Sequence, residues 1–127
     1  MAVGGTQKIL AVVGDLFFTV KIHEAAKRAG VAVEFVKSEV DALQKAAEER
    51  PVLIIFDLNF GGVDSLKVIR EIKAKPETKG ISLLGYLSHI QGELKQEAQK
   101  AGCDVVLATS AFSQNLMQIL TRHAALR

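Results

Sequence analysis

The segment Pro51-Val-Leu-Ile-Ile-Phe-Asp-Leu-Asn-Phe-Gly-Gly62 carries the strongest structural signal in this chain. Its apolar residues, Val52 to Phe56, run without a break into the carboxylate of Asp57, and a loop with two glycines follows. A short apolar run rich in β-branched residues is typical of a strand buried on both faces of a parallel sheet. Open α/β folds bind their ligands where such strands end, so we expect Asp57 to lie at a functional edge.

The composition is that of an ordinary single domain. The chain has 127 residues, of which 49% are hydrophobic and 24% are charged, and its formal net charge is +2. This small charge and the lack of tryptophan argue against a nucleic-acid-binding module. No apolar run approaches the roughly 20 residues that span a bilayer, and the single Cys103 fits a reducing compartment. We therefore expect a cytoplasmic protein that binds neither nucleic acid nor a membrane.

Strand-like and helix-like patterns alternate along the chain. The patterns predict strands over residues 8–13, 31–36, 51–57, 81–87 and 104–108, and helices over 17–28, from 39, over 65–74, over 93–101 and after a cap at Ser113. Strict alternation requires crossover connections, which build a parallel sheet with helices on both faces. The prediction is a three-layer α/β sandwich with five parallel strands in the order 2-1-3-4-5, spanning residues 8–123 between a flexible N-terminus (1–7) and a C-terminal tail (124–127).

Two carboxylates are predicted to converge at one edge of this sheet. In the order 2-1-3-4-5 the first and third strands are neighbours, and Asp15 and Asp57 stand at their C-terminal ends. Together with the backbone carbonyl of Asn59 they are plausible ligands for Mg²⁺, which prefers hard oxygen donors. The alternative is that both aspartates only end strands and cap the next helices, and spacing alone favours neither reading.

Over residues 8–123 the chain resembles the receiver domains of two-component response regulators. The resemblance is carried by the loop Asp57-Leu-Asn-Phe-Gly-Gly-Val-Asp64, which is similar to the family's phospho-acceptor loop, and by Ala101-Gly102 before the fifth strand. It implies that Asp57 accepts a phosphoryl group from a histidine kinase. It also implies that Asp15 is the second member of an acidic pair that holds Mg²⁺, with the carbonyl of Asn59 as a further ligand.

Other positions depart from the family's pattern. Gly14 stands where the first acidic residue belongs, Leu87 where a hydroxyl residue belongs with Ser88 one position later, Val106 where an aromatic switch residue belongs, Thr109 where a lysine belongs, and Ser110 where a proline belongs. A phosphorylated aspartate needs metal, ammonium and hydroxyl groups to meet its oxygens. The departures therefore predict weak Mg²⁺ binding and weak or absent phosphorylation at Asp57.

The resulting functional prediction is a signalling module rather than an enzyme. We expect an atypical receiver, stand-alone or excised from a longer chain, that acts through a histidine kinase or a downstream target. The family resemblance adds a homodimer through the fourth helix, fifth strand and fifth helix. The alternatives are a working phosphoswitch with unusual site residues and a flavodoxin-like carrier or enzyme. His89 would lie at the mouth of the site, as a pocket group or as a solvated loop residue.

Overall fold

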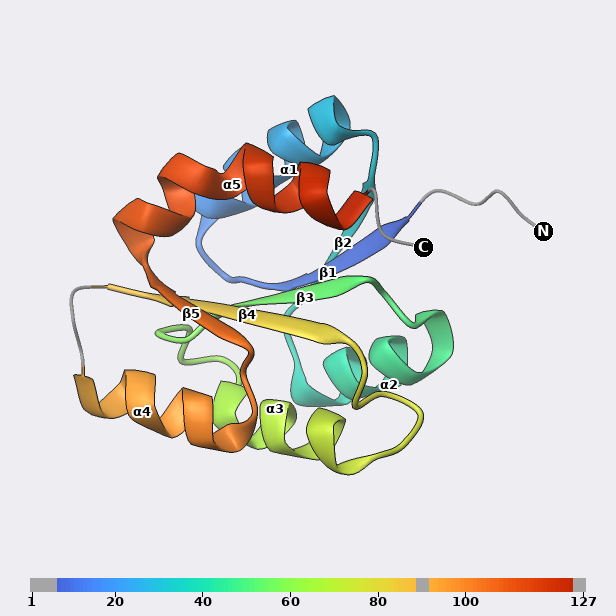
Figure 1. The fold of residues 1–127 in the computed structure, drawn as a ribbon, viewed down its shortest axis with the longest axis vertical. Helices are drawn as coiled ribbons and strands as arrows, with labels where there is room; N and C mark the ends of the chain where they lie inside the picture. Colours follow the sequence, from blue (N-terminus) through green and yellow to red (C-terminus); the bar gives the residue numbers. More distant parts are fainter. Residues whose placement is uncertain (1–6, 89–91, 125–127) are drawn as a thin grey trace.

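The computed structural model describes residues 7–88 and 92–124, and these residues form alternating strands and helices (Figure 1). The strands are β1 (Lys8–Val12), β2 (Ala32–Val36), β3 (Leu53–Asp57), β4 (Ser82–Leu87) and β5 (Val105–Ala108). The helices are α1 (Leu16–Ala29), α2 (Glu39–Glu49), α3 (Ser65–Ala74), α4 (Gly92–Ala101) and α5 (Thr109–Ala124). The predicted order of elements is confirmed.

The strands form one parallel sheet in the order β2-β1-β3-β4-β5, as predicted. Helices α1 and α5 cover one face of this sheet, and α2, α3 and α4 cover the other (Figure 1). In the register of the sheet, Val12 lies opposite Phe56, and Asp57 lies opposite Tyr86. The ends of β1, β3 and β4 therefore meet at one edge of the molecule.

The central strand β3 explains why the fold has two apolar cores. Leu53 and Ile55 pack with α1 and α5, whereas Ile54 and Phe56 pack with the helices of the other face. All of these side chains are buried, as expected for a central parallel strand with helices on both faces. The alternation also places the side chain of Asp57, at the end of the strand, on the face of Leu53 and Ile55.

The predicted starts of the first four helices agree with the structure to within one residue, and the predicted start of the fifth does not. The side chains of Asp15, Ser38 and Asp64 accept hydrogen bonds from backbone N–H groups in the first turns of α1, α2 and α3. In contrast, α5 already begins at Thr109, so the predicted cap at Ser113 was wrong. A proline at position 110 would disfavour the helical conformation at residue 109, and Ser110 imposes no such restriction.

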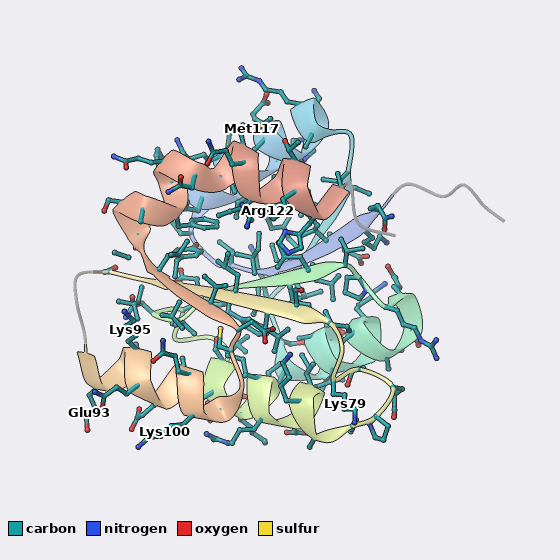
Figure 2. All side chains as sticks on the ribbon, viewed as in Figure 1. Lys79, Glu93, Lys95, Lys100, Met117 and Arg122 are labelled. Atoms are coloured by element: carbon teal, nitrogen blue, oxygen red, sulfur yellow. The ribbon has the colours of Figure 1, made fainter. Side chains whose placement is uncertain are left out.

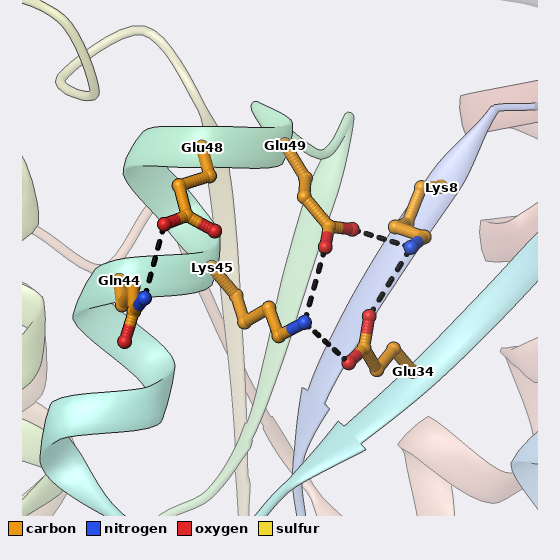
Figure 3. A network of polar contacts seen from close by, with 6 residues as sticks. All are labelled: Lys8, Glu34, Gln44, Lys45, Glu48 and Glu49. Carbon is orange, nitrogen blue, oxygen red and sulfur yellow. Dashed lines mark hydrogen bonds and ion pairs between the residues drawn. The ribbon is translucent and has the colours of Figure 1, made fainter.

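A network of ion pairs joins β1, β2 and α2 at the end of the sheet opposite to Asp57 (Figure 3). Lys8 binds Glu34 (3.1 Å) and Glu49, and Lys45 binds the same two carboxylates (3.1 and 3.3 Å). Hydrogen bonds with the lysines lower the pKa of both glutamates. These side chains are partly exposed, so each ion pair adds little to the stability of the fold.

The outer side of α4 is charged, as its sequence indicates. Glu93 and Lys100 extend from it on the side away from the sheet (Figure 2). Within the described part of the chain, no helix has both the length and the apolar character needed to cross a membrane.

Candidate functional site

Asp57 lies half-buried at the end of β3, and its own loop holds it in place. The N–H group of Asn59 donates a hydrogen bond to Asp57 Oδ1 (3.0 Å). This is the turn that an aspartate commonly forms with the backbone two residues on. Burial raises the pKa of Asp57, the hydrogen bond from Asn59 opposes this shift, and the negative charge of Asp15 adds to it. Asp15 is thus close enough to act on Asp57 electrostatically.

Asp15 follows β1 and is exposed to solvent. Its Oδ1 accepts a hydrogen bond from the N–H of Phe17 (3.0 Å), so it is the N-cap of α1. Its backbone carbonyl accepts from the backbone N–H and the hydroxyl of Thr19. The two interpretations of Asp15 are therefore not exclusive, because it caps α1 and its charge also raises the pKa of Asp57.

Asn59 ties the loop after β3 to the end of β4. Its side-chain Oδ1 accepts a short hydrogen bond from the N–H of Ser88 (2.7 Å). The backbone N–H of Leu58 donates to the carbonyl of Tyr86 (2.9 Å), which reinforces the same connection. The loop that carries the candidate carbonyl ligand is thus held to the end of β4 by two hydrogen bonds.

Phe60 takes part in the site, which sequence reasoning did not anticipate. A Cβ atom placed on Gly14 would lie 2.4 Å from Phe60 Cε1, and one placed on Gly62 would lie 2.7 Å from Phe60 Cζ. The ring therefore lies against both glycines. The backbone does not require glycine at position 14, because the left-handed glycines among the described residues are Gly30 and Gly102. Gly14 instead provides room for the ring.

The positions that depart from the receiver pattern are distributed between core and surface. Leu87 and Val106 are buried in the core on the side of α2, α3 and α4. Ser88 is exposed and donates its backbone N–H to Asn59, while Thr109 starts α5. Ser110 is exposed in the first turn of that helix. His89 lies outside the described residues.

An aromatic cluster lies beside Asp57 on the face of α1 and α5. The ring of Tyr86 stacks on Phe112 with 4.4 Å between centroids and lies 5.1 Å from Phe18. Burial raises the pKa of Tyr86, and the charges of Asp57 and Asp15 raise it further. Its hydroxyl is buried and finds no hydrogen-bond partner among the described residues. The only tyrosine of the chain, set in an apolar strand, was the available sequence signal for this cluster.

The residues at this edge suit Mg²⁺ only in part. Asp15 and Asp57 supply two carboxylates, but the ring of Phe60 fills the space at Gly14 where a third acidic side chain would stand. Within the ranges that the structure describes, no three His, Cys, Asp or Glu side chains gather as a metal site. Oxygen donors of the right kind are therefore present, in a smaller number than a strong site would have.

The chain was compared with protein-family models, curated proteins and solved structures, and only the solved structures match it. No protein-family model and no curated protein matches the chain. Solved structures do: the phosphorylated cyanobacterial phytochrome response regulator RcpA is 25% identical with a TM-score of 0.76, over 93% of this chain and 91% of that one. The chemotaxis response regulator CheY4 of Vibrio cholerae is 24% identical with a TM-score of 0.80, over 94% and 99%.

A third solved structure bears on the metal. The receiver domain of the sensor histidine kinase PA1611 from Pseudomonas aeruginosa is 21% identical with a TM-score of 0.81, over 96% of this chain and 100% of that one. That receiver has a magnesium ion coordinated in its active site cleft. The strand order, the ten alternating elements and these near-complete alignments agree. This chain therefore has the fold of the receiver domains of two-component response regulators.

Proposed function

We propose that this chain is an atypical receiver that acts by binding other signalling proteins and is phosphorylated at Asp57 weakly or not at all. The observation that carries the proposal is an apolar surface at the start of α1, formed by Leu16 (75% exposed), Phe17 (64%) and Val20 (53%). Large exposed apolar side chains that cluster on one surface mark interaction sites. This surface directly follows Asp15, so a partner bound there would lie next to the aspartate pair.

The side chains around Asp57 support the part of the proposal that concerns weak or absent phosphorylation. A phosphoryl group on Asp57 would carry a dense negative charge that metal, ammonium and hydroxyl groups must meet. Leu87 is a buried apolar side chain and Thr109 carries no positive charge. Mg²⁺ bound by Asp15 and Asp57 would neutralise part of that charge. With one acidic residue fewer, we infer weak Mg²⁺ binding.

The partner class follows from the receiver fold. A histidine kinase or a downstream signalling protein is the partner we propose for the surface of Leu16, Phe17 and Val20. A second copy bound through α4, β5 and α5 stays a prediction, as does a cytoplasmic location. Val105 in β5 is 44% exposed, which is compatible with a contact there.

Phosphorylation is the first test. The purified chain is incubated with acetyl phosphate and Mg²⁺, and intact-mass spectrometry counts the phosphoryl groups, with Asp57→Asn as the matched control. We expect a small fraction of modified protein that disappears in the variant. Amide NMR spectra with beryllofluoride are expected to change only near Asp57. Stoichiometric phosphorylation with shifts across β4, β5 and α5 would instead establish the alternative, a working phosphoswitch.

Partner binding is the second test. Leu16→Ser and Phe17→Ser are compared with Val40→Ser, because Val40 is equally exposed (71%) but lies on α2, on the other face of the sheet. Binding to purified histidine-kinase phosphotransfer domains is measured by calorimetry. We expect at least a tenfold loss of affinity in the α1 variants, which is about 1.4 kcal/mol, and no loss in the control. Equal affinity in all three variants would contradict an interaction through α1.

A further inference from the structure

We infer that Phe60 occupies the space of the missing acidic residue and thereby limits the access of Mg²⁺ to the carboxylates of Asp15 and Asp57. The inference rests on the proposed receiver function, because it takes these two carboxylates as the metal site. It goes further by assigning the weakness of that site to an aromatic side chain as well as to a missing charge. The obstruction is therefore removable by substitution at position 60.

The contacts of the ring support this assignment. A Cβ atom on Gly14 would meet three atoms of the Phe60 ring at 2.4, 2.7 and 2.9 Å, distances at which one of the two groups must move. A Cβ atom on Gly62 would also meet the ring, at 2.7 and 2.8 Å. An aspartate at position 14 would thus collide with the ring before its carboxylate reached a metal ion. The ring would therefore have to move before an acidic side chain at position 14 could be accommodated.

The loop gives the ring a defined position. The N–H of Phe60 donates to the carbonyl of Asp57 (3.0 Å), and Asn59 is bound to Ser88. The ring is partly buried and packs against the apolar core on the side of α2, α3 and α4. A half-buried aromatic ring that leaves its position exposes apolar surface to water, which is unfavourable. The ring therefore resists displacement by a weakly held hydrated ion.

The ring also affects the electrostatics of the site. Mg²⁺ keeps several water molecules when it binds a carboxylate, so it needs open, polar space around its ligands. Phe60 puts apolar atoms at Gly14, the residue next to Asp15. Removing the ring would admit water to this space, and adding a carboxylate there would supply the missing oxygen donor. The effects of Phe60→Ala and Gly14→Asp on Mg²⁺ affinity are expected to be non-additive, because the new carboxylate needs the space that the ring occupies.

Four proteins test the inference: the wild type, Gly14→Asp, Phe60→Ala and the double variant. Mg²⁺ binding is followed through the amide chemical shifts of Asp57 and Asn59, and Mn²⁺ binding through paramagnetic broadening of the same signals, without any phosphoryl donor. We expect Phe60→Ala to bind Mg²⁺ more tightly than the wild type. The double variant is expected to bind at least about tenfold more tightly than Gly14→Asp alone, the scale on which supporting groups alter metal affinity.

Matched controls separate the ring from other causes. Phe35→Ala removes a phenylalanine that is partly buried, like Phe60, but lies in β2 and packs against the core on the side of α1 and α5, and it should leave the affinity unchanged. Asp57→Asn in the double-variant background should abolish the gain. Phe60→Leu, which keeps an apolar contact, replaces Phe60→Ala if the alanine variant does not fold. It is expected to give a smaller gain of the same sign.

Two results would overturn the inference. Equal affinity of Gly14→Asp and the double variant would show that the ring does not obstruct the site, and the receiver function would still stand. No gain in any variant would show that Asp15 and Asp57 are not a metal site. Failure of the proposed function would give different results. The wild type would be phosphorylated stoichiometrically, or the α1 variants would bind the partner as tightly as Val40→Ser.

Discussion

Replacing Tyr86 by phenylalanine should stabilise the protein, although tyrosine is the larger side chain. Tyr86 is 2% exposed, and its ring stacks on Phe112 at a centroid distance of 4.4 Å with 7° between the planes. Its hydroxyl is buried and lacks a hydrogen-bond partner among the described residues. A buried polar group without a partner costs about 1–3 kcal/mol. The phenylalanine ring keeps the stacking and removes this cost.

The expected gain is large enough to measure. For a domain of this size, 1 kcal/mol corresponds to a shift of the melting temperature of roughly 4 °C. Tyr86→Phe should therefore raise the midpoint of thermal unfolding by roughly 4–12 °C. Urea unfolding followed by circular dichroism should show a higher midpoint with an unchanged slope.

A control variant separates the ring from the hydroxyl. Tyr86→Leu removes the stacked ring together with the hydroxyl, so it should be less stable than Tyr86→Phe. The reasoning is refuted if Tyr86→Phe lowers the free energy of unfolding. That result would mean that the hydroxyl is hydrogen-bonded, for example to a buried water molecule, and that this bond contributes to the fold.

Three further predictions concern other buried or charged groups. Burial raises the pKa of Asp57 in the folded state, so its charge destabilises the fold above the unfolded-state pKa of 3.8. Asp57→Asn should therefore stabilise the protein at pH 7, and the gain measured by urea unfolding should shrink toward pH 4. A difference that does not change with pH would contradict this. Lys73 Nζ donates to Asp104 Oδ2 (3.0 Å) and to two backbone carbonyls, so Lys73→Met should cost about 1–2 kcal/mol in urea melts, whereas the exposed Lys100→Met should cost almost nothing. Equal effects of the two lysine variants would argue against the Lys73 bonds. Ser65 Oγ is buried without a partner among the described residues, so Ser65→Ala should raise the unfolding free energy by up to about 1 kcal/mol, and a lower value would indicate a bound water.

The architecture was predictable from the sequence alone, and the same sequence pattern identified Asp57 as the proposed centre of the site. The apolar run that ends at Asp57 is typical of a central parallel strand, and the structure confirms this prediction, with apolar partners on both faces. The alternation of patterns then required crossover connections and a three-layer arrangement, which the sheet order confirms. Local chemistry was readable as well: Asp15, Ser38 and Asp64 cap helices as short polar side chains do.

The way in which side chains fill the space around Asp57 became visible only in the folded structure. Gly14 was readable as a missing carboxylate, but not as room for the ring of Phe60, because that contact joins two loops far apart in the sequence. The position of Tyr86 beside Asp57 likewise depends on the register between β3 and β4. The start of α5 at Thr109 was missed because a strong capping residue at Ser113 competed with an apolar face that extends back to Phe112. Pattern and spacing show which elements form, whereas the packing between loops decides which side chains occupy the site.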